Sequence, residues 1–204
     1  MQWLYFGFCM QANIDNPLLY QTPDAWLKTV LENFDTFLQD HAAAEKKAAG
    51  MAISMISHYP NRTMLVEAMV DLAIEEMAHY REMIKILHAR GLFLTADTKD
   101  TYVNQLRRLL RKDSNDYFLD QLLLAAVLEA RGAERFGLVA NALTDPALKK
   151  TYTVIAQSEQ RHYALFLSLA QHYFNSSLVE ERTVYWLERE AEMMQATATA
   201  PRLH

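Results

Sequence analysis

Two Glu-x-x-His pairs are the side chains in this sequence whose types and spacing are best suited to binding metal ions. Glu76 and His79 belong to the run EMAH, and Glu159 and His162 belong to the run EQRH. Residues three apart share one face of a helix, so each pair would present a carboxylate and an imidazole together. An unpaired carboxylate buried in an apolar core is costly, so a pair that faces inward needs a compensating charge.

Both pairs interrupt lines of apolar residues at heptad spacing. The first line consists of Leu65, Met69, Leu72, Glu76, His79, Met83 and Ile86. The second consists of Leu148, Tyr152, Ile155, Glu159, His162, Phe166 and Leu169. One such pair alone is a weak motif, because a short pattern needs structural context. Two pairs on the inward faces of two helices predict a polar site in a shared core.

Two further carboxylates are expected at the level of these pairs. In an antiparallel helical hairpin, residues equidistant from the turn lie side by side. Glu45 and Glu76 are centred near the turn YPNR, and Glu129 and Glu159 are centred within LTDP. Each hairpin therefore offers a glutamate opposite a Glu-x-x-His pair.

Glu134 competes with Glu129 for the fourth carboxylate position, because its midpoint with Glu159 also falls near the turn. The inward line of this helix consists of Leu119, Leu122, Ala126, Glu129, Ala133, Phe136, Ala140 and Leu143. Glu134 lies roughly 140° around the helix from Glu129, at about 100° per residue. We therefore expect Glu129 to face the core.

Four carboxylates and two imidazoles at one level form a ligand set for a pair of metal ions. The candidate metal ligands, which are also the candidate catalytic residues, are Glu45, Glu76, His79, Glu129, Glu159 and His162. Two divalent cations balance four carboxylates, which could not all stay ionised in an empty apolar core. Mixed oxygen and nitrogen ligands suit iron or manganese. The alternatives are satisfied core ion pairs, or a glutamate that faces water.

Residues next to these ligands are candidates for supporting roles. A metal-bound histidine usually gives its second N–H to an acceptor outside the ligand set. Glu75 and Ser158, which each precede a ligand glutamate, could supply that acceptor or could make ordinary surface and interhelical contacts. Tyr80 and Tyr163 each follow a ligand histidine, where packing is favoured over a redox or proton-relay role.

The elements that must position these residues are helices. The chain has 204 residues, of which 51% are hydrophobic, and only five Gly and five Pro, which favours a single all-α domain over residues 1–204. Core helices are expected near residues 40–58, 61–90, 114–142 and 146–175. Flanking helices are expected near residues 22–38, 99–112 and 177–195, the first with Thr22 as its N-cap. Two hairpins joined by a longer crossover predict a ferritin-like four-helix bundle.

Cysteine usage and hydropathy exclude several classes of protein. The one cysteine, Cys9, excludes a disulfide framework and a Cys-ligated zinc or iron–sulfur site within one chain, which fits a reducing cytoplasm. The apolar run MQWLYFGFCM has no basic flank, so we expect it to pack against the bundle rather than to direct targeting. No stretch reaches the roughly eighteen apolar residues of a membrane span.

The formal net charge is −5, so the overall charge of the chain does not favour nucleic-acid binding. Its basic residues are nevertheless clustered. One cluster consists of Arg107, Arg108, Arg111 and Lys112, and two further pairs are Lys46 with Lys47 and Lys149 with Lys150. Taken alone, such clusters are most often solvated helix faces.

Four runs, DHAAAEKKAA, EEMAHYREMIKILHARG, LEARGAERF and SEQRHYALF, together resemble the tRNA 2-methylthio-N6-isopentenyladenosine hydroxylase family, MiaE. The resemblance covers about residues 20–190. It implies that Glu45, Glu76 and His79 hold one iron ion. It also implies that Glu129, Glu159 and His162 hold the second iron ion. By analogy with related oxygenases, Glu76 and Glu159 would bridge the two ions.

The resemblance also implies an activity. Enzymes of this family hydroxylate the isopentenyl side chain of a hypermodified adenosine beside the anticodon, using O₂ and two electrons per turnover. With one cysteine and no nucleotide-binding glycine motif, this chain is expected to depend on a separate electron-transfer protein, and to be a monomer or small homo-oligomer. The alternatives are iron oxidation or storage of the ferritin and bacterioferritin type, and a rubrerythrin-like peroxidase, which usually carries a Cys-ligated iron module.

A tRNA substrate gives the basic clusters more weight as phosphate contacts around a looped-out base. We favour Arg107, Arg108, Arg111 and Lys112 for this role. Further candidates are Lys46, Lys47, Arg131, Arg135, Lys149 and Lys150.

Overall fold

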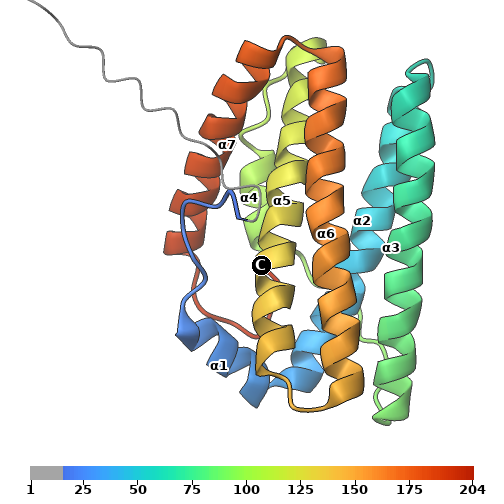
Figure 1. Ribbon diagram of the computed structural model, residues 1–204, viewed down its shortest axis with the longest axis vertical. Coiled ribbons are helices and arrows are strands. Elements are labelled where there is room, and N and C mark those ends of the chain that lie inside the picture. The colour runs from blue at the N-terminus through green and yellow to red at the C-terminus, as the bar shows by residue number, and fades with distance from the viewer. Residues whose placement is uncertain (1–15) are drawn as a thin grey trace, which may run out of the picture.

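The computed structural model describes residues 16–204, so the run MQWLYFGFCM and Cys9 lie outside the described residues. Within residues 16–204 the chain forms seven helices and no strand (Figure 1). The helices are α1 (Asp24–Glu32), α2 (Phe34–His58), α3 (Thr63–Ala89), α4 (Thr101–Arg107), α5 (Ser114–Ala142), α6 (Pro146–Tyr173) and α7 (Ser176–Ala196). None of these helices is long and apolar enough to cross a membrane.

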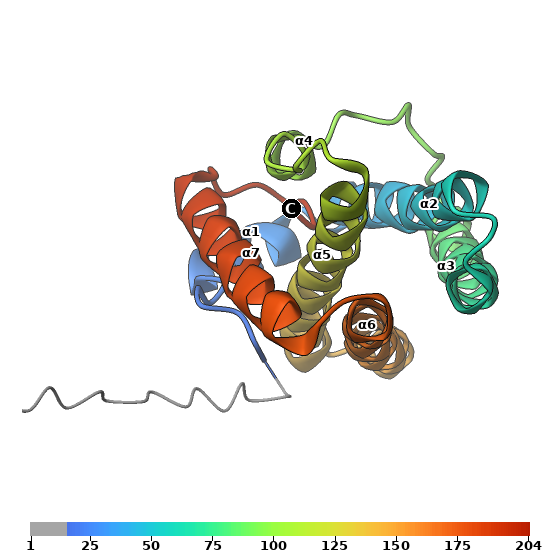
Figure 2. The same cartoon turned by 90° about the horizontal axis from the view of Figure 1, so that it is seen from above.

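Four long helices form two antiparallel hairpins, α2 with α3 and α5 with α6. Figure 2 shows the first hairpin on one side of α5 and α6, and α7 with α1 on the other side. The longer connection that contains α4 joins the two hairpins. The predicted all-α, ferritin-like arrangement of two hairpins and a crossover is confirmed.

Side-chain caps fix where the second hairpin begins and turns. The carboxylate of Asp113 accepts a hydrogen bond from the backbone N–H of Asn115 at the start of α5. Asp145 accepts from the backbone N–H groups of Ala147 and Leu148, and Pro146 occupies the first helical position of α6. The turn LTD is therefore short and specific, which sets the residue pairing between α5 and α6.

The first hairpin differs from expectation near its N-terminal end. Instead of helices over 22–38 and 40–58, α1 ends at Glu32 and α2 begins at Phe34, because Asn33 leaves the helical conformation and its side chain binds the carbonyl of Thr29. Thr22 does not cap α1. Its backbone N–H and its hydroxyl both donate to the carboxylate of Glu134, at 2.8 and 2.6 Å.

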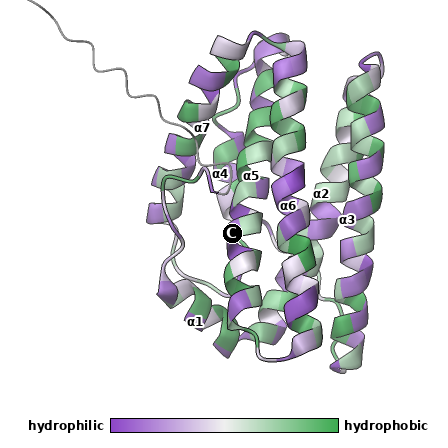
Figure 3. Cartoon of the chain, in the orientation of Figure 1, coloured by the Kyte–Doolittle hydropathy of each residue, from purple (hydrophilic) through white to green (hydrophobic). Residues whose placement is uncertain are grey.

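Two apolar clusters fill the bundle above and below a polar layer. α3 contributes Met69 and Leu72 to one cluster, and α6 contributes Phe166 to the same one. The other cluster contains Met83 from α3 and Tyr152 from α6. Because the Glu-x-x-His pairs lie between these residues in the sequence, they occupy the layer between the clusters. Figure 3 shows purple, hydrophilic segments at mid-height of α5 and α6, with green segments above and below.

Buried ion pairs attach α7 to the outer side of α5. The guanidinium of Arg131, which is fully buried, donates to both carboxylate oxygens of Glu190 at 2.8 and 3.0 Å. The hydroxyl of Tyr102 on α4 donates to the same carboxylate at 2.7 Å. Nearer the start of α5, Asp120 accepts hydrogen bonds from Arg111 and Arg182. These contacts pair the buried charges of Asp120 and Arg131 on α5.

Candidate metal centre

All six predicted ligands meet in the polar layer of the bundle. α2 supplies Glu45, α3 supplies Glu76 and His79, α5 supplies Glu129, and α6 supplies Glu159 and His162. None of the six is more than 9% exposed. They form two overlapping groups, which are Glu45, Glu76, His79 and Glu159, and Glu76, Glu129, Glu159 and His162. Within each group, one ligand atom from every residue lies within 4.8 Å of the others, and Glu76 and Glu159 belong to both groups.

Both histidines turn Nδ1 toward the carboxylates. Nδ1 of His162 lies 3.0 Å from Oε1 of Glu76, 3.5 Å from Oε2 of Glu159 and 3.9 Å from Oε2 of Glu129. Nδ1 of His79 lies 3.7 Å from an oxygen of Glu76 and 3.7 Å from an oxygen of Glu45. The two imidazole rings are 6.3 Å apart between centroids, so each can serve a different metal ion.

The centre of the cluster contains buried polar atoms without hydrogen-bond partners among the described residues. These atoms are Oε1 and Oε2 of Glu76, Nδ1 of His79 and Nδ1 of His162. An unsatisfied buried polar group costs about 1–3 kcal/mol, and more if it is charged. These unpartnered oxygen and imidazole nitrogen atoms from α3 and α6, beside the carboxylates that α2 and α5 supply, fit a pair of metal ions.

Charges in the metal-free cluster are balanced by protons. Burial raises the pKa of Glu45 and of Glu129 well above the ordinary value, and neighbouring carboxylates raise both further. Burial opposes the charged form of His162, but attraction to the nearby carboxylates of Glu159 and Glu76 outweighs burial and raises its pKa to about 10. Metal ions would take the place of these protons.

His162 is oriented from outside the cluster by Glu75. Nε2 of His162 lies 3.1 Å from Oε2 of Glu75. The other carboxylate oxygen of Glu75 accepts hydrogen bonds from Ser158 at 2.5 Å and from Arg161 at 2.7 Å. Burial acts against ionisation of Glu75, but the hydrogen bonds from Ser158 and His162 lower its pKa to about 2. Glu75 is thus an ionised acceptor for the second nitrogen of His162, and Ser158 acts through Glu75.

Two buried residues next to the cluster were not predicted from the sequence. Nε2 of His41 lies 2.5 Å from Oε1 of Glu45, and Nδ1 of His41 lies 3.1 Å from the hydroxyl of Tyr152. Both His41 and Tyr152 are fully buried. The available signal was spacing, since His41 precedes Glu45 by four residues and Tyr152 lies on the same inward line as Glu159.

The structure separates Glu129 from its competitor Glu134. Glu129 lies inside the cluster, whereas the carboxylate of Glu134 accepts hydrogen bonds from Thr22 and pairs with Arg131 on the far side of α5. The angular difference between the two positions on α5 accounts for this separation.

Two of the candidate phosphate contacts, Arg131 and Arg135, are wrong because their side chains are buried. Arg131 is 0% exposed and binds Glu190. Arg135 is 4% exposed and donates to the carbonyl of Leu203 and the hydroxyl of Thr22. Neither guanidinium can reach a phosphate without breaking these contacts.

Some of the other basic candidates are held by ion pairs or hydrogen bonds within the protein, and the rest are exposed to solvent. Arg111 is held by Asp116 and Asp120 at 3.0 and 2.9 Å. Lys46 pairs with Asp97, and Lys47 donates to the carbonyl of Thr98, both on the crossover. The exposed candidates are Arg107, Arg108, Lys112, Lys149 and Lys150.

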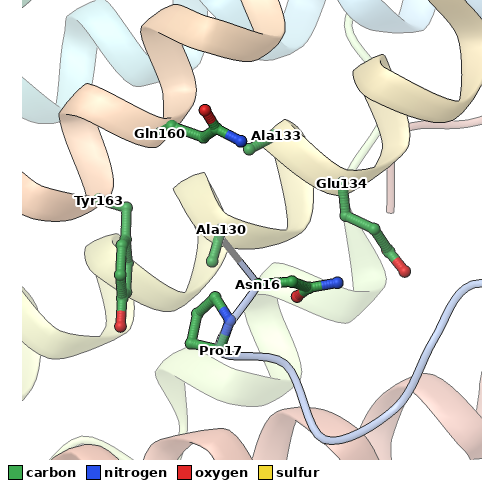
Figure 4. A pocket seen from close by; sticks show the side chains of 7 residues that line it. All are labelled: Asn16, Pro17, Ala130, Ala133, Glu134, Gln160 and Tyr163. Carbon is green, nitrogen blue, oxygen red and sulfur yellow. The ribbon is translucent and has the colours of Figure 1, made fainter. Parts of the chain in front are cut away.

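Figure 4 shows a cavity of about 50 Å³ between α5, α6 and the segment that leads to α1. It is lined by Asn16, Pro17, Ala130, Ala133, Glu134, Gln160 and Tyr163. None of the six candidate ligands lines this cavity.

Comparison with known proteins gives consistent matches along the chain. Residues 9–204 match the model of a family described as "MiaE: tRNA-(MS[2]IO[6]A)-hydroxylase (MiaE)". A Pseudomonas putida protein named tRNA 2-(methylsulfanyl)-N(6)-isopentenyladenosine(37) hydroxylase is 34% identical over 191 residues, covering 94% of this chain and 93% of that protein. A Salmonella typhimurium protein of the same name is 28% identical over 165 residues, covering 81% of this chain and 60% of its relative.

A solved structure also has this fold. It is titled "Protein 43 with aldehyde deformylating oxygenase activity from Synechococcus" and superposes with a TM-score of 0.87. Its sequence is 32% identical, and the match covers 92% of this chain and 94% of that chain. The shared fold therefore includes the helices that carry the polar cluster.

Proposed function

The chain belongs to the MiaE family of tRNA hydroxylases, and on that premise we propose that it hydroxylates the isopentenyl side chain of 2-methylthio-N6-isopentenyladenosine in tRNA. The observation that carries the proposal is the buried cluster of four carboxylates and two imidazoles, arranged as two overlapping groups. The nucleoside lies beside the anticodon, so the substrate is an anticodon loop.

Glu45 and His79 would hold one metal ion and Glu129 and His162 a second, while Glu76 and Glu159 belong to both ligand groups. Two reduced iron ions would supply the electrons that activate O₂ for the insertion of one oxygen atom into a C–H bond, a reaction beyond any side chain. The six candidate ligands would hold the two ions, and Glu75 orients His162. The apolar clusters on either side of the site keep water away from the reaction.

The electrons come from a separate protein in this proposal, since the cluster provides no group that takes hydride from a nicotinamide. The iron-loaded chain with NADPH alone is expected to give no product, and addition of a reductase and its electron-transfer partner is expected to restore turnover. Product from the purified chain with NADPH alone would remove the need for a partner.

The test of the function is an assay on modified tRNA. Iron-loaded protein, an electron source and O₂ are incubated with tRNA that carries the methylthio-isopentenyl nucleoside, and the digested nucleosides are analysed by mass. We expect that nucleoside to gain one oxygen atom, and we expect Glu76→Ala and His162→Ala to abolish the gain. Glu67→Ala, an exposed change on the same helix α3, serves as the control. An unchanged nucleoside with the iron-loaded protein would refute the proposal.

The same protein preparation distinguishes tRNA hydroxylation from two other activities, iron storage and the conversion of aldehydes. Iron storage of the ferritin type requires a large hollow shell, whereas we expect a monomer or small oligomer on gel filtration. The comparisons favour the hydroxylase over storage, because both curated relatives carry that name. The Synechococcus protein is titled for activity on aldehydes, so a long-chain aldehyde belongs in the assay as a competing substrate. Product from the aldehyde alone would redirect the assignment.

A further inference from the structure

The two halves of the proposed metal centre are not equivalent, because only one of the two unshared carboxylates is held from outside. Oε1 of Glu45 lies 2.5 Å from Nε2 of His41, while Oε2 of Glu45 faces Nδ1 of His79 at 3.7 Å. Within residues 16–204, no side chain outside the cluster donates a hydrogen bond to Glu129. Glu45 therefore has one oxygen occupied and one free, whereas Glu129 has two oxygens available.

The direction of the hydrogen bonds around His41 follows from the chemistry of its neighbours. A carboxylate that binds a metal ion carries no proton, so Glu45 accepts and Nε2 of His41 donates. In a neutral imidazole the other nitrogen is an acceptor, so Nδ1 of His41 accepts a hydrogen bond from the hydroxyl of Tyr152, 3.1 Å away. Burial raises the pKa of the Tyr152 hydroxyl well above its ordinary value, so this donor keeps its proton.

Packing fixes the orientation of the His41 ring as well. The ring of Phe136 lies 4.3 Å from that of His41 between centroids, and the ring of Phe37 lies 6.1 Å away. His41, Phe37 and Tyr152 are all 0% exposed. A buried imidazole with both nitrogens bonded and aromatic rings packed beside it is held in one orientation.

We propose that His41 is a positioning residue that holds Glu45 by Oε1 and reserves Oε2 for the metal ion bound by His79, with Tyr152 fixing the donor nitrogen of His41. The metal ion bound by His162 has no such restraint on its carboxylate, so Glu129 is the ligand that can change its mode of binding. This inference rests on the proposed function only in requiring that the cluster binds metal ions.

The test is a titration of the metal-free, full-length protein with Co²⁺, followed by visible absorption and by calorimetry. We expect two bound ions in the unaltered protein. His41→Leu should weaken one of the two sites about 10- to 100-fold and change its absorption spectrum, since loss of a partner that orients a ligand has effects of this size. His41→Gln, which retains an N–H donor, should recover most of the affinity, and Tyr152→Phe should weaken the same site by less.

Leu87→Ala is the control, because it removes buried packing from the same apolar cluster, about two helical turns along α3 from His79, and leaves both hydrogen bonds of His41 in place. It should lower the unfolding temperature without changing either Co²⁺ affinity. Wild-type affinities at both sites in a folded His41→Leu protein would overturn the inference, and so would equal weakening of both sites. If His41→Leu does not fold, unchanged binding and spectra in both His41→Gln and Tyr152→Phe would overturn it. An unaltered protein that binds no Co²⁺ would instead refute the proposed function.

Discussion

At the scale of single residues, the buried carboxylates that suit the cluster to metal binding lower the stability of the metal-free protein. A carboxyl group whose pKa is raised in the folded state favours folding at acid pH and loses that contribution as the pH rises through its folded pKa. Glu45 and Glu129 are both in this situation, because they are buried beside other carboxylates. Metal ions would offset this penalty, so metal binding is expected to stabilise the folded protein.

Glu129→Gln is expected to separate these two properties. The amide has nearly the same shape as the carboxyl group and no charge to bury, so the metal-free variant should unfold at a higher temperature than the metal-free wild type at neutral pH. Its gain in unfolding temperature on adding Fe(II) without oxygen should be smaller, because one metal ion loses a ligand. Thermal unfolding followed by circular dichroism measures both changes. A variant that is less stable when metal-free would contradict this reasoning.

Metal affinity should increase with pH because protons and metal ions compete for the same atoms. In the metal-free protein, the raised pKa values of Glu45, Glu129 and His162 keep protons on the ligands, and each must leave before its atom can coordinate. We expect more than one proton to be released per protein and tighter binding at about pH 8 than at about pH 6. Calorimetry in buffers of different ionisation enthalpy counts these protons. Binding without proton release would mean that the ligands are already ionised.

The convergence of the six candidate ligands could be predicted from the sequence, because their positions depend on helical period and hairpin pairing alone. His41 and Tyr152 could not be assigned in the same way. Each lies on an inward apolar face, where a histidine or tyrosine is usually ordinary core packing. Their partner is revealed only by the direction in which the side chain of Glu45 turns, and that direction is not encoded in spacing.

At the scale of elements, Gly132 controls how closely α6 approaches α5 beside the site. A Cβ atom at Gly132 would lie 3.6 Å from Cγ of Glu159 and 3.7 Å from the ring of Phe136, which is ordinary van der Waals contact. Any larger side chain at this position would have to displace Glu159, which belongs to both ligand groups.

Substitutions at Gly132 are therefore expected to depend steeply on size. Gly132→Ala should leave metal stoichiometry unchanged and stabilise the protein by about 0.5–1 kcal/mol through helix propensity. Gly132→Val should reduce binding of both ions, because Glu159 is shared. Urea unfolding and metal analysis of the two variants provide the comparison. Full metal binding by Gly132→Val would show that α6 shifts to make room.

The helix ends illustrate what the sequence leaves open at this scale. The start of α5 and the turn into α6 agree with expectation, because Asp113, Asp145 and Pro146 are local signals. The use of Thr22 as a donor to Glu134 depends on contacts across more than a hundred residues, between the segment before α1 and α5. Local patterns cannot supply such contacts.

At the scale of the whole molecule, the basic residues show why composition is a poor guide to an RNA footprint. Arg131 and Arg135 were reasonable candidates by charge, but α7 and the C-terminal segment cover them, and both are buried. Burial of this kind is a tertiary property. Arg107, Arg108 and Lys112 remain exposed on and beside α4.

Replacing Arg107, Arg108 and Lys112 together by Ala should weaken tRNA binding and make it less sensitive to salt. Each lost phosphate contact is expected to lower the slope of log K against log salt by about 1. Binding of labelled tRNA across a series of salt concentrations measures the slope.

A control for net charge replaces Lys28, Arg81 and Lys85, which are exposed on α1 and α3, by Ala. This variant loses the same number of positive charges, so any effect of net charge alone appears in it. Equal slopes for the two triple variants would exclude the surface around α4 from the footprint.

The most direct measurement of the central claim is anomalous diffraction at the iron edge from crystals of the full chain loaded with Fe(II) without oxygen. We expect two peaks about 3.5–4 Å apart in the polar layer, as in other two-metal sites. One peak should contact Glu45 and His79, the other Glu129 and His162, and both should lie between Glu76 and Glu159. A single peak, or iron bound only outside these six side chains, would contradict it.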